Sequence, residues 1–149
     1  MTTIQSNPAE VNLEQLINRL LSSYQPVAVN QKSFFINEVS PDLFVATDQE
    51  VLCTLLGSLF YIVARCSSDT SITISATAYE DITVLHITDS RVNNYAVLYK
   101  FQHLQMLSEK IGGFLDISNQ RNKQTIISYS FRSKSEIKEQ AVIREMIRA

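Results

Sequence analysis

Glycine is scarce in this chain, which has only Gly57, Gly112 and Gly113 among its 149 residues. An average composition would supply about ten glycines. Loops that cradle a phosphate need glycine, because their backbone takes positive φ angles and approaches the ligand closely. The sequence has no glycine-rich loop, which counts against an ordinary nucleotide site.

The sequence also lacks an excess of charge of one sign and a closely spaced pair of cysteines. The net charge is −2, so we expect no surface for nucleic acid or for an anionic membrane. Cys53 and Cys66 form no CxxC pair, and on one helix they would lie about 20 Å apart, too far for a disulfide. We therefore expect two unreactive thiols.

The ends and the hydropathy of the chain indicate an ordinary soluble protein. The first twelve residues have neither the basic start nor the apolar core of a secretion signal. We find no apolar run long enough to cross a bilayer, so no membrane contact and a cytoplasmic location are the expectations. The length favours one domain.

Residues 47–64 form the stretch around which the chain is organised. Thr47 and Glu50 have the spacing of a capping box. Apolar side chains then recur at helical spacing, namely Leu52, Leu55, Leu56, Leu59, Phe60 and Val63. This pattern predicts a central core helix.

The other predicted elements are helices and short alternating strands. A first helix begins at the cap Asn12 and ends near Tyr24, before Pro26. We predict strands over 33–39, 71–78, 82–89, 114–118 and 125–132, a helix over 95–111 with Gly112 as its left-handed cap, and a final helix from a capping box at Ser133 and Glu136 to Arg148.

This order predicts an α+β two-layer sandwich. Its sheet would be mixed, mostly antiparallel and of about five strands, with the helices on one face and a C-terminal helix added. Strands 71–78 and 82–89 would form an antiparallel hairpin. We assign residues 1–11 to a flexible leader, 12–132 to the domain and 133–149 to the C-terminal helix.

Several segments resemble the ATP-binding domain of sensor histidine kinases, the GHKL-type or Bergerat fold that type II topoisomerases also have. ITVLHITDS, over 82–90, resembles the strand that ends in the family's DxGxG box. LQMLSEKIGGFLDIS, over 104–118, resembles the helix–GG–strand segment after the nucleotide lid, and KQTIISYSFR, over 123–132, the final strand. The resemblance covers about residues 12–132. The phosphoacceptor helical hairpin that precedes this module in a kinase has no counterpart in the sequence.

The family's central helix reads NLLxNAxK, and the matching stretch here is SLFYIVAR. The resemblance puts Ser58 at the first asparagine, Ile62 at the magnesium-binding asparagine and Arg65 at the lysine that helps the phosphates. Isoleucine cannot ligate Mg²⁺, which requires oxygen ligands. The simpler interpretation makes Arg65 an exposed cation at a helix end, where the helix dipole favours it.

The family's DxGxG box is only partly kept. Asp89 stands at the carboxylate that reads adenine, but Arg91 and Asn93 replace the two glycines. Thr125 matches the family's late threonine, and only about five residues, 90–94, stand where the family has a flexible lid. Asp89, Arg65 and Thr125 are thus the cofactor-binding candidates if nucleotide binding survives. The simpler interpretation makes Asp89 a cap of the next turn and Thr125 an ordinary strand residue.

One sheet face suggests a partner. Ile72, Ile74, Ala76 and Ala78 share one face of their strand, while Ile82, Val84 and His86 share the face that the family register turns away from the helices. Two apolar faces on a half-exposed sheet suggest a covering layer. The terminal helix or a second copy of the chain would supply it.

Three functional hypotheses follow. The first is a non-catalytic histidine-kinase-like domain, without a cofactor or metal, that binds a kinase, a response regulator or its own copy, as a homodimer, in bacterial phosphorelay-type signalling. The second is a residual ATP-binding, kinase-like ATPase domain that uses Asp89 and Arg65 with Mg²⁺. The third is a histidine phosphotransfer protein that uses His86 or His103, although a lone histidine is weak evidence for chemistry.

Overall fold

The computed structural model describes residues 10–121 and 123–137. Along the chain the elements are β1 (Glu10–Asn12), α1 (Leu13–Asn30), β2 (Phe34–Asn37), β3 (Leu43–Ala46), α2 (Gln49–Cys66), β4 (Ser71–Tyr79), β5 (Ile82–Asp89), the 3₁₀ helix η1 (Ala96–Lys100), α3 (Gln102–Lys110), β6 (Phe114–Gln120), β7 (Gln124–Arg132) and β8 (Lys134–Ile137).

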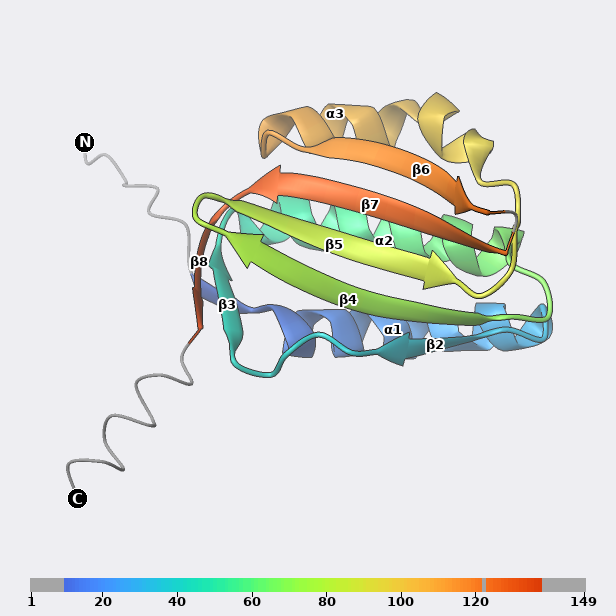
Figure 1. Cartoon of the computed structure of the whole chain (residues 1–149). Helices are drawn as coiled ribbons and strands as arrows, with labels where there is room; N and C mark the ends of the chain where they lie inside the picture. Colours follow the sequence, from blue (N-terminus) through green and yellow to red (C-terminus); the bar gives the residue numbers. More distant parts are fainter. Residues whose placement is uncertain (1–9, 122, 138–149) are drawn as a thin grey trace, which may run out of the picture.

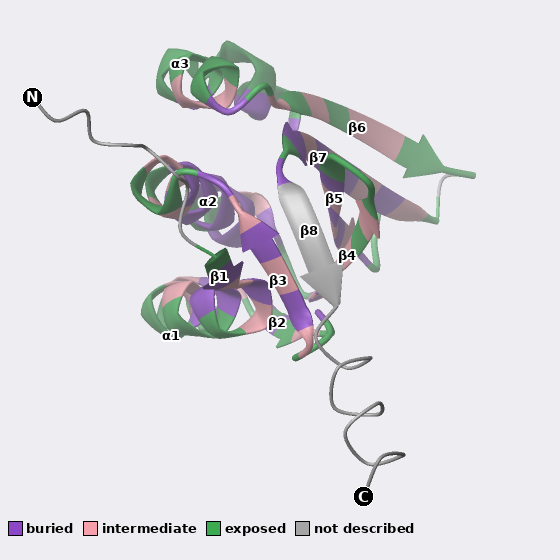
Figure 2. Cartoon of the chain, turned by 90° about the vertical axis from the view of Figure 1, so that its left-hand side faces the viewer, coloured by how far each residue is buried: buried purple, intermediate pink, exposed green. Residues whose placement is uncertain are grey.

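Five strands form the main sheet, in the order β2-β4-β5-β7-β6. Only the β2–β4 pair is parallel, and the other pairs are antiparallel. Figures 1 and 2 show that the three helices lie on the same side of this sheet. A second sheet, β1-β3-β8, lies at one end of the molecule (Figure 2). The predicted two-layer α+β sandwich is therefore confirmed.

Helix α2 is the central core helix, as predicted, and its apolar stripe is buried between the sheet and the other helices. The predicted cap was wrong, because Asp48 and not Thr47 begins the helix: Asp48 Oδ1 accepts a hydrogen bond from the Val51 amide at 3.1 Å. Thr47 follows directly on β3 and is buried. Phe44 and Val45, which precede this helix, belong to β3, a strand that pairs with β1 and β8.

Helix α2 also corrects the expectation about membrane spans. By length and composition alone, Gln49–Cys66 is long and apolar enough to cross a bilayer. Half of this helix is buried inside the protein, as befits a core helix. The same apolar stripe that fills the core gives the segment its hydropathy.

Helix α1 is longer than predicted. Asn12 caps it as expected, accepting from the Gln15 amide at 3.0 Å, but the helix continues past Pro26 to Asn30. Tertiary contacts hold the last turns, since the Gln25 side chain accepts from the Phe35 amide at 2.8 Å and donates to the Phe35 carbonyl at 3.3 Å. These bonds and the burial of Ala28 outweigh the one backbone bond that a proline removes.

The predicted helix over 95–111 is divided into η1 and α3. Phe101 separates them with an extended backbone, at φ −87° and ψ 95°. Gly112 has φ +62°, so the left-handed cap after α3 is confirmed.

The β4–β5 hairpin is antiparallel, as predicted, and it explains the two apolar faces. Ile72 and Ile74 lie beneath the helices and are fully buried, so that face belongs to the core and needs no partner. Ile82, Val84 and His86 lie on the other face and are exposed or half-buried. Only this second face is open.

The start of the predicted C-terminal helix is wrong. Ser133 caps no helix; its hydroxyl lies 2.6 Å from that of Thr83, and its amide donates to the Asp81 carbonyl. The next four residues form β8, because β3 offers a strand edge with which they pair. Residues 138–149, to which the rest of the predicted helix belongs, lie outside the described residues.

Gly113 allows α3 to pack on β7, which gives a prediction. A Cβ atom at Gly113 would lie 1.9 Å from Tyr129 Oη and 2.7 Å from Ser108 Oγ. Because the Tyr129 ring is buried, we expect Gly113→Ala to lower the free energy of unfolding by about 1–3 kcal/mol, as overpacking does. Urea denaturation measures the change.

Gly57→Ala is the matched control for Gly113→Ala. Gly57 is inside α2, where alanine favours the helix by about 1 kcal/mol relative to glycine. The atom nearest to a Cβ added at Gly57 would be Tyr24 Oη, at 3.1 Å. We expect this control to change stability far less. Equal stability of Gly113→Ala and the unmodified chain would contradict the packing at this position.

Candidate functional site

The candidate site is built around Asp89, the last residue of β5, whose side chain is 1% exposed. Its carboxylate accepts from the Thr70 hydroxyl and the Arg91 amide (2.9 Å) at Oδ1, and from Asn93 Nδ2 (2.6 Å) and Tyr95 Oη (2.6 Å) at Oδ2. A carboxylate offers about four acceptor positions. All of them are therefore used by donors from the chain itself.

Tyr95 is the residue that closes the site over Asp89. Its ring is 1% exposed, and its phenol donates directly to Asp89. Burial, and then the hydrogen bond to the Asp89 carboxylate, raises the pKa of Tyr95 well above its usual range. The phenol therefore stays protonated and remains a donor to Asp89 at ordinary pH.

Thr125 lies beside Asp89, because the two residues face each other in the β5–β7 register. Thr125 is fully buried, and its Oγ1 accepts from the Asn93 amide at 3.1 Å. The same oxygen lies 3.1 Å from the Arg91 carbonyl and 2.9 Å from Asn119 Oδ1. Thr125 thus holds the loop of Arg91 and Asn93 against the sheet. In this loop these two residues stand where the family has glycines.

Arg65 does not join Asp89 and Thr125. It is exposed at the end of α2, its Nη1 donates to Tyr61 Oη at 3.3 Å, and its guanidinium carbon lies 5.9 Å from the centre of the Tyr61 ring. Arg91 also turns away, to a surface ion pair of 3.4 Å with Asp69. Of the three cofactor-binding candidates, the fold therefore brings together two.

The position expected for a metal ligand is apolar. Ile62 is a buried member of the core, on the same helix as Arg65. Within residues 10–121 and 123–137 there is no group of three or more His, Cys, Asp or Glu side chains that could hold a metal ion. Burial raises the pKa of the Cys66 thiol more than the nearby Arg65 lowers it, which disfavours the reactive thiolate.

The two histidines lie apart from this site. His86 is half-buried on the open face of the sheet, with Nδ1 3.5 Å from Ser128 Oγ. His103 is exposed at the start of α3, with its ring edge-on to Phe101. In the described part of the chain, neither histidine forms an ion pair with a carboxylate.

The donors that complete the site were not predicted from the sequence. Thr70, Asn93 and Tyr95 had no assigned role, and Tyr95 was expected to begin a helix. A signal was available, because Asn93 and Tyr95 follow a strand-end carboxylate within six residues and both carry donors. The proposed turn cap at Asp89 is the interpretation that the hydrogen bond from the Arg91 amide supports.

Comparisons with known proteins rest on the fold, since no family model and no curated protein matches the sequence. Among solved structures, the histidine kinase AdeS of Acinetobacter baumannii is similar over 87% of this chain and 68% of its own, with a TM-score of 0.72 and 15% identity. The mycobacterial sensor histidine kinase MprB is similar over 86% of this chain and all of its own (100%), with a TM-score of 0.65 and 14% identity. This chain has the fold of a histidine-kinase ATP-binding domain.

A third structure with this fold contains a partner. The histidine kinase ThkA, solved in complex with the response regulator TrrA, is similar over 85% of this chain and 42% of its own, with a TM-score of 0.65 and 16% identity. Asp89 and Thr125, which the resemblance assigned to the nucleotide site, lie side by side in this fold.

Tyr95→Phe tests the closed site. The variant removes one donor to a buried carboxylate, which should cost about 1–3 kcal/mol of unfolding free energy at pH 7. Because the folded-state pKa of Tyr95 is raised, its contribution is present below the ordinary phenol pKa of about 10 and is lost as the pH rises above it.

The unmodified chain should accordingly lose stability above pH 10 more steeply than Tyr95→Phe, by up to about 1.4 kcal/mol per pH unit. Burial also raises the pKa of Tyr129, so some alkaline loss should remain in the variant. Urea denaturation at pH 7 and at alkaline pH measures both effects. Identical pH slopes for the two proteins would show that the phenol is not held as described.

Proposed function

We propose that this chain is a non-catalytic, histidine-kinase-like domain that acts as a protein-interaction module in bacterial two-component or phosphorelay-type signalling, in the cytoplasm. The Asp89 carboxylate carries the proposal. In the family that this chain resembles, this carboxylate reads adenine, and here its four hydrogen bonds all come from the chain itself. An adenine would have to displace Asn93 or Tyr95 from it.

The surroundings of Asp89 support the same proposal. Ile62 offers no oxygen to Mg²⁺, and Arg65 turns to Tyr61. A short loop tied to Thr125 replaces the flexible lid of the family. Phosphate groups would therefore find neither the metal nor the glycine backbone that usually holds them.

The segment that follows the short loop, through η1 and into α3, supports the interaction role. Apolar side chains exposed between residues 92 and 106 are Val92, Val97, Tyr99, Phe101 and Met106. Exposed apolar side chains gathered in one segment are typical of protein-binding surfaces. We propose a response regulator as the partner, with a kinase or a second copy as the alternatives, because ThkA, which has the same fold, was solved with one.

Titration calorimetry with ATP and ADP, each with Mg²⁺ and up to millimolar concentration, tests the non-catalytic part. We expect no binding heat and no rise in melting temperature, whereas a ligand at 100 times its dissociation constant would add about 2.7 kcal/mol. A histidine-kinase ATP-binding domain with intact boxes is the positive control. Binding tighter than about 100 µM that Asp89→Asn abolishes would overturn the proposal in favour of a residual ATP-binding domain.

Receiver domains of response regulators from the same organism test the partner. We expect one of them to bind, and Met106→Lys to weaken that binding by at least about fivefold, because it places a charge on an apolar contact. Met106 is 63% exposed, so this change should not disturb folding. Tyr79→Lys, at a tyrosine 59% exposed on the β4–β5 hairpin, is the matched control and should bind normally. If the Met106→Lys variant binds the receiver domain as tightly as the unmodified chain does, the contact does not include Met106.

A further inference from the structure

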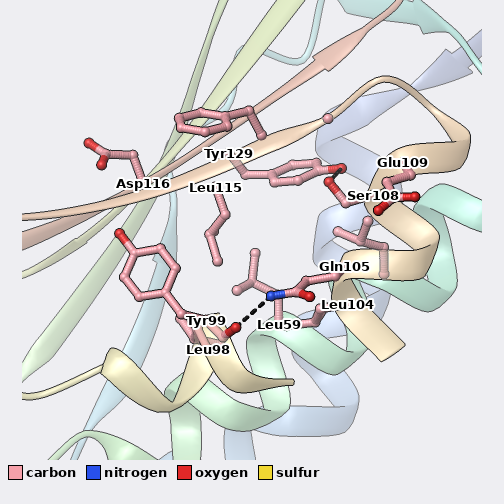
Figure 3. A pocket seen from close by; sticks show the side chains of 13 residues that line it. Leu59, Leu98, Tyr99, Leu104, Gln105, Ser108, Glu109, Leu115, Asp116 and Tyr129 are labelled. Atoms are coloured by element: carbon pink, nitrogen blue, oxygen red, sulfur yellow. Dashed lines mark hydrogen bonds between the residues drawn. The ribbon is translucent and has the colours of Figure 1, made fainter. Parts of the chain in front are cut away.

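A cavity lies beneath α3, away from Asp89. Its volume is about 360 Å³, and residues of α2, η1, α3, β6 and β7 line it (Figure 3). None of the positions matched to the nucleotide boxes, from Ile62 and Arg65 to Asp89 and Thr125, lines it. This cavity is therefore separate from the site described above.

The size of the cavity suits a small molecule. Protein interiors contain few voids larger than a water molecule, and an apolar cavity of about 150 Å³ already accommodates benzene. Its volume of about 360 Å³ falls in the range of roughly 300–1,000 Å³ that small-molecule sites occupy. A molecule of two or three rings would fit it.

Apolar side chains form most of the wall. Figure 3 shows Leu59, Leu98 and Leu104 on one side of the cavity and Leu115 opposite them. The first three are buried although the cavity lies against them. Such a surface gains free energy when an apolar ligand covers it, at about 25 cal/mol per Å².

Hydrogen bonds hold the walls in position. Tyr99 Oη accepts from the Ile117 amide at 2.9 Å, which fixes η1 against the edge of β6. The Gln105 side-chain amide donates to the Tyr99 carbonyl at 2.5 Å, and Tyr129 Oη donates to Ser108 Oγ at 3.1 Å. Because these bonds are already made, a ligand would meet a largely pre-formed site.

The same hydrogen bonds leave polar atoms for a ligand. Ser108 Oγ accepts a hydrogen bond from Tyr129, and Tyr99 Oη accepts one from the Ile117 amide. Among the described residues, neither hydroxyl has an acceptor for its own hydrogen. Gln105 keeps its carbonyl oxygen free to accept. A ligand with a single N–H or O–H group would thus find both a donor and an acceptor.

The charges near the cavity exclude an anion. Of the charged residues that line it, Glu109 and Asp116 are both acidic, and no lysine or arginine is among them. An anionic ligand would enter without a cation to compensate for its lost hydration. We propose that this cavity binds a neutral, mainly apolar small molecule of two or three rings that carries a hydrogen-bonding group.

Two dyes that differ by one charge test the proposal on the full chain. N-phenyl-1-naphthylamine is neutral and has one N–H, and 8-anilinonaphthalene-1-sulfonate has the same rings with a sulfonate added. We expect one molecule of the neutral dye to bind per chain, with fluorescence enhancement, and the anionic dye to bind at least about tenfold more weakly. Absence of binding by the neutral dye, or equal binding of both, would overturn the proposal.

Variants locate the bound dye. Leu115→Trp should fill the cavity and weaken binding of the neutral dye at least about tenfold. Ile82→Trp is the matched control, since Ile82 is also on a strand but 45% exposed on the open face of the sheet. The Ile82→Trp variant should bind the neutral dye as tightly as the unmodified chain does. Loss in the control with retention in Leu115→Trp would place the dye on the open face and refute the site.

Methyl NMR of the unmodified chain gives the location without any variant, should Leu115→Trp fail to fold. The neutral dye should shift the methyl signals of Leu59 and Leu104, because its rings would lie against them. The signals of Leu20, half-buried on α1 and outside the cavity lining, should stay in place. Shifts at Leu20 alone would contradict the assignment.

Discussion

The buried carboxylate of Asp89 is the constraint on which this end of the structure depends. A carboxylate that is removed from water costs several kcal/mol unless hydrogen bonds replace its hydration. Among the described residues no Lys or Arg side chain pairs with Asp89, and the donors come from the turn before β4 and from the loop after β5. Those segments must therefore pass close to Asp89, which fixes the path of the chain from β5 to η1.

The same constraint links the site to the glycine content. Asn93 stands at one of the family's two glycines and places its side-chain amide on Asp89. The bond from residue 91 comes from the backbone amide, which a glycine would also supply. The register of β5 and β7 then puts Thr125 where it can bind the backbone of that loop. The sequence alone indicated the replacement of the glycines but not the hydrogen bond that Asn93 makes to Asp89.

Periodicity in the sequence predicted the elements that local pattern determines, and tertiary contacts decided the rest. The stripe of α2 and the alternation of β5 are repeated over whole elements, so both were found with nearly correct ends. Pro26 was taken as a helix end because the bonds of Gln25 to β2 are not visible in the sequence. Ser133 was taken as a cap because its pairing with Thr83, fifty residues away, is equally non-local. Tyr95 was missed for the same reason.

The segment from the Asp89 loop to α3 is held at several points, and this bears on the kind of function it suits. In the family, a lid must move to admit a nucleotide. Here Asn93 and Tyr95 bind Asp89, while Tyr99 is bound to the edge of β6. A segment fixed at both ends loses little freedom when a partner covers its exposed apolar side chains, which lowers the entropic cost of association. The hydrogen bonds of Asn93, Tyr95 and Tyr99 therefore hold this segment in one position, which is what the proposed interaction surface requires.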